Sequence, residues 1–113
     1  MKLSEVSILF IFIILDYLTG VCVAIYEKQV NSAIGRKGIS NKVGIIICVV
    51  VCKLIDTLQI AGFSPILPIV SLFFILNECF SILENLSRLN VPIPEILTSM
   101  LKNFQKKKQK SGD

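Results

Sequence analysis

Three long apolar stretches, residues 6–25, 43–60 and 66–83, alternate with polar segments along this chain. A helix of about 20 apolar residues crosses the roughly 30 Å of hydrocarbon in a bilayer. A helix on a soluble core needs only one apolar stripe, whereas these stretches are apolar almost all round. The pattern predicts an all-α integral membrane protein with three transmembrane helices.

Each stretch nevertheless contains charge: Asp16 in the first, Lys53 and Asp56 in the second, and Glu78 in the third. A charged side chain at the centre of a bilayer costs about 2.5 to 3.5 kcal/mol on insertion scales. We therefore expect these residues to face one another or water.

Composition supports a membrane protein of one domain. Of the 113 residues 53% are hydrophobic and 18% are charged, which leaves too little polar surface to cover a soluble helical bundle of this hydrophobicity. The four cysteines all lie in the apolar stretches and the chain has no histidine. Small packed hydrophobes therefore explain them better than disulfides or a zinc site.

Basic residues outside the stretches predict the orientation. The segment 27–42 and the segment after residue 83 are both basic, while the turn at residues 61–65 carries no charge. The positive-inside rule then places the N-terminus outside and the C-terminus in the cytoplasm. The residues expected to fix this topology and to contact lipid headgroups are Arg36, Lys37, Lys42, Lys106, Lys107 and Lys108.

The chain then divides into a transmembrane domain, residues 1–101, and a basic cytoplasmic tail, residues 102–113, which comes after a short apolar segment. Lys2 and the apolar run after it resemble a signal peptide, but Asp16 and Tyr17 interrupt the pattern. We expect the first stretch to remain as a span. If the first stretch were instead peripheral or removed, two spans would remain, and the segments after residue 27 would keep the same sides of the membrane.

Turn residues divide the chain further. Gly35, Gly38 and their polar neighbours predict an irregular loop at residues 27–42, and the turn at residues 61–65 predicts a helical hairpin. Pro68 fits the first turn of the third helix. That helix should continue to Leu89, with Glu84 and Arg88 as an i,i+4 ion pair, and end at residues 90–94.

Polar side chains within the spans form stripes. On the first helix the stripe is an expected association surface, and it consists of Asp16, Thr19, Gly20, Ala24 and Glu27. On the third helix the polar flank consists of Asn77, Ser81, Glu84 and Arg88. These groups either bond neighbouring helices or line water once several copies assemble. Because Asp16 and Lys53 lie at similar depths in the proposed topology, we also expect a cluster of Asp16, Lys53 and Asp56, within a subunit or between neighbours.

The sequence shows no catalytic constellation, so an enzyme is not expected, and it implies no cofactor or metal. The basic tail lacks the aromatic platform or recognition helix of a nucleic-acid-binding protein. We expect no nucleic acid among its partners.

The residues resemble the toxin-secretion and phage-lysis holin family. The resemblance rests on LDYLTG at residues 15–20, NSAIGRKGISNK at 31–42, NECFSILEN at 77–85 and VPIP at 91–94. The positions that resemble characteristic family positions are Asp16, Thr19, Gly20, Asn31, Ser32, Gly38, Lys42, Asp56, Glu78, Ser81, Glu84, Asn85, Pro92 and Pro94. Lys53 departs from that pattern.

The resemblance implies a bacteriophage or toxin-locus protein that forms homo-oligomeric holes in the bacterial cytoplasmic membrane at a set time. An endolysin or a toxin would then escape without direct contact, leading to cytolysis or export. Two alternatives remain: a small multidrug transporter or channel subunit, which normally has four spans, and a non-conducting membrane adaptor.

Overall fold

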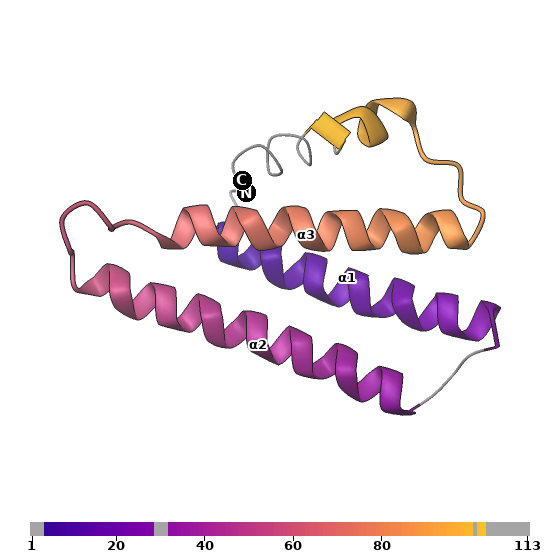
Figure 1. The fold of residues 1–113 in the computed structure, drawn as a ribbon, viewed down its shortest axis with the longest axis horizontal. Helices are drawn as coiled ribbons and strands as arrows, with labels where there is room; N and C mark the ends of the chain where they lie inside the picture. Colours follow the sequence, from indigo (N-terminus) through magenta and orange to yellow (C-terminus); the bar gives the residue numbers. More distant parts are fainter. Residues whose placement is uncertain (1–3, 29–31, 101, 104–113) are drawn as a thin grey trace, which may run out of the picture.

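Three helices make up most of the chain in the computed structural model, which describes residues 4–28, 32–100 and 102–103. They are α1 (Glu5–Tyr26), α2 (Ser32–Thr57) and α3 (Leu67–Arg88), and no strand occurs among the described residues. α1 and α3 run in the same direction and α2 runs opposite to them (Figure 1). All of α1, all of α3 and Gly38–Thr57 of α2 are long and apolar enough to cross a bilayer, which confirms the predicted three spans.

Helix ends follow local sequence signals. The Ser4 side chain accepts a hydrogen bond from the Ser7 backbone N–H (3.2 Å) at the start of α1. Pro68 lies in the first turn of α3, as predicted. α3 continues past the apolar stretch to Arg88, also as predicted, and Asn90 follows with a φ of 66°, a conformation that asparagine tolerates well.

The start of α2 differs from the prediction. Residues 32–42 are helical rather than an irregular loop. A helix satisfies its own backbone polar groups, which favours continued helix where the chain enters a bilayer. Gly38 and Gly44 lie in open surroundings on α2, with nothing within 4 Å of a Cβ built on either. The side chains of residues 32–37, including Arg36 and Lys37, lie outside the described part of the structure, as do Lys106, Lys107 and Lys108.

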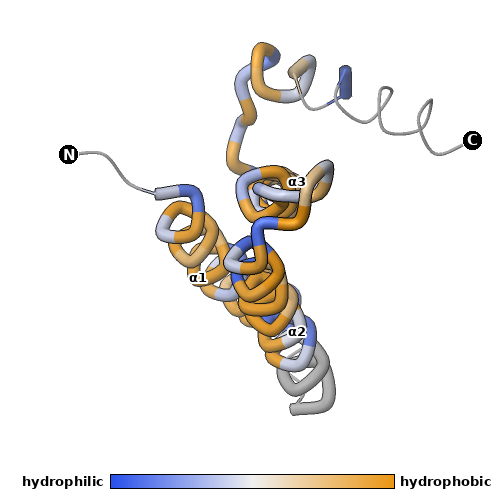
Figure 2. The backbone as a smooth tube through the Cα atoms, turned by 90° about the vertical axis from the view of Figure 1, so that its left-hand side faces the viewer, coloured by the Kyte–Doolittle hydropathy of each residue, from blue (hydrophilic) through white to orange (hydrophobic). Residues whose placement is uncertain are grey.

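The helices pack unequally. α1 packs most closely against α3, and α2 contacts both of them more sparsely. The apolar core consists of Leu9 and Ile13 from α1 and Val49 from α2. Figure 2 shows that hydrophobic residues continue along the helices well beyond this small core. Most of the apolar surface is therefore exposed, as expected of helices surrounded by lipid.

The hairpin between α2 and α3 is fixed by Asp56. Its two carboxylate oxygens accept hydrogen bonds from the backbone N–H groups of Ile66 (2.7 Å) and Leu67 (2.8 Å). These donors lie at the start of α3, where no intrahelical partner exists for them. Asp56, which the sequence analysis assigned to an ion cluster, therefore caps α3.

Asp56→Ala should lower the stability of the folded chain by about 1 to 2 kcal/mol, because it removes the cap of α3. Asp56→Asn retains one acceptor oxygen and should lose about half as much. Thermal unfolding of the purified protein in detergent, followed by circular dichroism, measures this. Lys53→Ala, one turn earlier and exposed, is the control and should change little. Equal loss in Asp56→Ala and Lys53→Ala would contradict the capping role.

Candidate functional site

One charged residue from each helix meets in the interior of the bundle. The Lys42 ammonium on α2 donates hydrogen bonds to Asp16 Oδ2 on α1 and to Glu78 Oε2 on α3, the latter at 2.6 Å. Asp16 is 8% exposed and Glu78 is 4% exposed. We call these three residues the ion triad. It is the feature that connects all three helices through side chains.

The ion triad lies near the middle of two spans. Asp16 and Glu78 are each about 15 Å from either end of their helix, at about 1.5 Å per residue. Lys42 starts nearer the end of the apolar part of α2, and its long side chain reaches the two acids. Breaking a buried ion pair by removing one partner is more unfavourable than keeping both. The triad is therefore the arrangement that lets these charges reside at this depth.

Polar side chains extend the ion triad toward the C-terminal ends of α1 and α3. Asn85 donates from Nδ2 to Asp16 Oδ1 (3.2 Å) and to Thr19 Oγ1 (2.9 Å). Gly20 lies beside the same amide, since a Cβ at Gly20 would be 3.8 Å from Asn85 Nδ2. Asp16, Thr19 and Gly20 thus face α3 of their own chain. They form the polar seam between the two parallel helices.

The far end of this seam holds an ion pair that the sequence did not predict. Arg88 donates from Nε to Glu27 Oε2 (3.3 Å) and from Nη2 to Glu27 Oε1, so it bonds α1 rather than Glu84 of its own helix. The guanidinium donates twice and each carboxylate oxygen accepts once, and such a bidentate pair adds geometric specificity as well as energy. Asn90 donates to the Tyr26 hydroxyl at 3.0 Å and closes the same end. The predicted Glu84–Arg88 pair is wrong.

The predicted cluster of Asp16, Lys53 and Asp56 is wrong within a single chain. Asp16 binds Lys42, Asp56 caps α3, and Lys53 is exposed on α2. The error came from treating Lys42 as a loop residue, which left Lys53 as the nearest base. The signal that could have found the true partner is the spacing of Lys42, Ile45, Val49, Cys52 and Asp56, which places them on one face of a continuous helix.

The remaining predicted site residues lie on α3. Asn77 and Ser81 are half-buried, and Glu84 is exposed. The four cysteines are free thiols: Cys52 is buried, as expected of a packed hydrophobe, whereas Cys22 is exposed.

These features define a small helical membrane protein whose outward surface suits lipid and whose interior holds two acids paired with one base. Residues 4–106 match the bacteriophage holin family, and the chain belongs to it. It is a multi-pass membrane protein.

Several proteins are similar to this chain over most of its length. A protein of Clostridium perfringens described as an uncharacterised 14.9 kDa protein in the nagH 3' region is 42% identical over 88% of this chain and 76% of its own length. An uncharacterised protein of Listeria innocua is 35% identical over 96% of this chain and 74% of its own. A protein of Bacillus phage phi105 described as a probable holin is 33% identical over 88% and 73%. No solved structure matches the chain.

The stability lost on removing a charge from the ion triad should depend on how many charges are left unpaired. Lys42→Gln leaves two buried carboxylates without a cation and should destabilise the chain by on the order of 3 kcal/mol. Asp16→Asn and Glu78→Gln each leave one acid with one base, so each should cost about 1 kcal/mol. Thermal unfolding in detergent, followed by circular dichroism, measures whether the three stability losses fall in this order.

Lys53→Gln is the matched control, because it removes the same charge from the exposed side of the same helix and should shift stability by less than about 0.5 kcal/mol. The triple change Asp16→Asn, Lys42→Gln and Glu78→Gln should regain part of the loss of Lys42→Gln. If Lys42→Gln and Lys53→Gln behave alike, the ion triad does not hold the bundle together.

Proposed function

We propose that this protein assembles into holes in the bacterial cytoplasmic membrane that release an endolysin or a toxin at a set time. Membership of the bacteriophage holin family supports the general role. The observation that carries the proposal is the ion triad: two acids are buried at mid-bilayer depth inside one chain and share one ammonium there. Such a chain can accumulate in a membrane without perturbing it.

Opening requires the polar seam to reach water. α2 covers the ion triad, yet it packs more loosely than α1 and α3 pack together. Two polar ties hold it: the ion triad and the Asp56 cap. Withdrawal of α2 from the other two helices would uncover Asp16 and Glu78. Carboxylates that lose their ammonium are stable only in contact with water or a neighbouring cation.

Assembly supplies that environment. Several copies that turn their uncovered seams toward a common centre create a hydrated lumen, while the outward apolar faces stay in lipid. Each copy adds a small free-energy bias, so the array switches once enough copies are present. The cargo needs no direct contact with the hole. The phage relative described as a probable holin supports the holin role.

Induced expression in a bacterial host should stop growth abruptly after a delay and should let a co-expressed cytoplasmic murein hydrolase lyse the culture. The delay reflects accumulation to the switching density. Optical density and membrane potential, followed together, measure both events. Steady growth with an intact membrane potential at high expression would contradict the proposal and favour a non-conducting adaptor.

The ion triad should also set the delay. Lys42→Gln weakens the attachment of α2 and should bring lysis forward at equal membrane abundance, whereas Lys53→Gln should keep the original timing. The exchange Asp16→Lys with Lys42→Asp keeps two acids and one base in the triad and should return the delay toward its original value. If Lys42→Gln does not accumulate in the membrane, the exchange variant provides the test. Failure of the exchange variant to accumulate as well would contradict charge pairing as the cause.

We further propose that the N-terminus lies outside and the C-terminus in the cytoplasm, from the distribution of basic residues. In a variant with all four cysteines replaced by serine, Phe63→Cys should react with a membrane-impermeant maleimide added to intact cells. Ile34→Cys and Lys108→Cys should react only after permeabilisation. External labelling of Ile34→Cys would reverse the orientation.

A further inference from the structure

The charges of the ion triad do not balance. Asp16 and Glu78 are both buried, and both bond the single ammonium of Lys42. With both acids ionised, two negative charges face one positive charge, and one negative charge is left over at the centre of the bundle. A buried charge without a counter-ion is unfavourable, and two carboxylates that share one site seldom ionise together. The site therefore needs one more positive charge.

No other described side chain supplies that charge. The ionisable groups that act on Glu78 are Asp16 from α1 and Lys42 from α2. Lys53 is exposed on α2, and Arg88 bonds an acid at the far end of the seam. A buried acid that finds no second cation can take up a proton and become neutral. The missing charge is then a proton on one of the two acids.

Hydrogen-bond donors indicate which acid carries the proton. Asp16 accepts from the Lys42 ammonium and also from Asn85 Nδ2 (3.2 Å). Glu78 accepts from the Lys42 ammonium (2.6 Å), and no second donor to it occurs among the described residues. Donors to a carboxylate favour its ionised form. Asp16 is therefore the better position for the negative charge, and Glu78 is the better position for the proton.

A protonated Glu78 has an acceptor within reach. Asp16 Oδ2 and Glu78 Oε2 bond the same nitrogen atom, so these two oxygens lie within about 5 Å of each other. The neutral acid can therefore donate its O–H to the Asp16 carboxylate. The triad then consists of one ammonium, one carboxylate and one carboxylic acid, and its total charge is zero.

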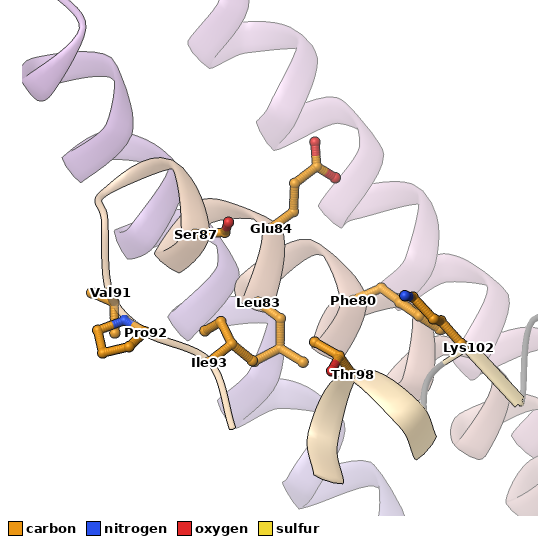
Figure 3. Close-up of a pocket in the computed structure, with 9 residues that line it drawn as sticks. All are labelled: Phe80, Leu83, Glu84, Ser87, Val91, Pro92, Ile93, Thr98 and Lys102. Carbon is orange, nitrogen blue, oxygen red and sulfur yellow. The ribbon is translucent and has the colours of Figure 1, made fainter. Parts of the chain in front are cut away.

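Glu84 on the same helix has a different environment. The chain turns back after α3, and Glu84 lies at the edge of a groove of about 570 Å³ between α3 and residues 91–98 (Figure 3). Glu84 is exposed, and its carboxylate points away from the apolar side chains of Leu83 and Ile93. It is also only four residues from the end of α3, where water is available. Glu84 is therefore the matched control acid for Glu78.

We propose that the ion triad is a proton-binding site, in which one proton on Glu78, shared with Asp16, neutralises the bundle while Lys42 is in place. Withdrawal of α2 brings both acids into water, where Glu78 becomes a carboxylate and its proton passes to a water molecule. The closed bundle thus holds one proton more than the open one, so a rise in pH favours opening. The proton site rests on the fold in a membrane alone, whereas the link to opening rests on the proposed function.

Infrared spectroscopy of the full-length protein in lipid vesicles at neutral pH tests the proton site, with carbon-13 in the side-chain carboxyl groups of glutamate. The wild type should show the C=O stretch of one protonated glutamic acid. Glu78→Gln should lose this band and Glu84→Gln should keep it. Asp16→Asn should lose it too, because Glu78 then pairs one-to-one with Lys42 and ionises. Circular dichroism verifies that each variant is helical. Absence of the band in the wild type, or an undiminished band in Glu78→Gln or Asp16→Asn, would overturn the proposal.

Release of an encapsulated dye from the same vesicles tests the link to opening, with equal pH inside and outside. Leakage through the wild type should become several-fold faster from mildly acidic to mildly alkaline pH, and Glu84→Gln should behave alike. Glu78→Gln has no proton to release there, so its leakage should depend little on pH. Leakage through the wild type that is independent of pH would overturn proton release on opening. Vesicles that leak at no pH would contradict hole formation, and the infrared band decides the proton site in either case.

Discussion

The pairing of Lys42 with Asp16 and Glu78 is the constraint on which the arrangement of the three helices depends. Each residue alone is unfavourable at mid-bilayer depth, and each comes from a different helix. Bringing them together fixes the rotation of α1 and α3 about their axes and the position of α2 along them. The apolar core cannot do this, because in lipid the hydrophobic effect gives little preference for one apolar face over another. Polar contacts carry the specificity.

The seam between α1 and α3 follows from the same requirement. Once Asp16 and Glu78 face inward, Thr19 and Gly20 one turn later necessarily face α3, and Asn85 can reach them. The Glu27–Arg88 pair completes the row at the helix ends, where water is available and a charge pair is inexpensive. α1 and α3 thus share a continuous polar seam, whereas the described side chains of α2 make one ionic contact, near the start of its apolar part, and one cap, near its end. The structure concentrates its weakest packing at the helix that covers the charges.

Much of this fold was predictable from sequence, and the reasons for the failures are physical. Hydropathy and length identified the three spans, and the 3.6-residue period extended α3 to Arg88. The partners of the charges were not predictable from depth alone. The positive-inside rule counts Lys42 as a topology signal, but a lysine at the border of a span can also bend its long side chain inward to an acid. Asp56 likewise looked like an ion-pair partner, although the unsatisfied N–H groups at the start of a helix can donate hydrogen bonds to a carboxylate equally well.

The two roles of Lys42 bear on how such a protein can change state. A base at the membrane border can exchange an internal carboxylate for a lipid phosphate or for water, because its ammonium lies within a side-chain length of both environments. Asp16 and Glu78 have no such option, since their short side chains remain at the centre of the spans. Release of Lys42 is therefore inexpensive for the lysine and expensive for the two acids. That asymmetry makes the uncovered acids, rather than α2, the groups that must find a new partner, and in the assembly proposed above this partner is water in the lumen or a lysine released on a neighbouring copy.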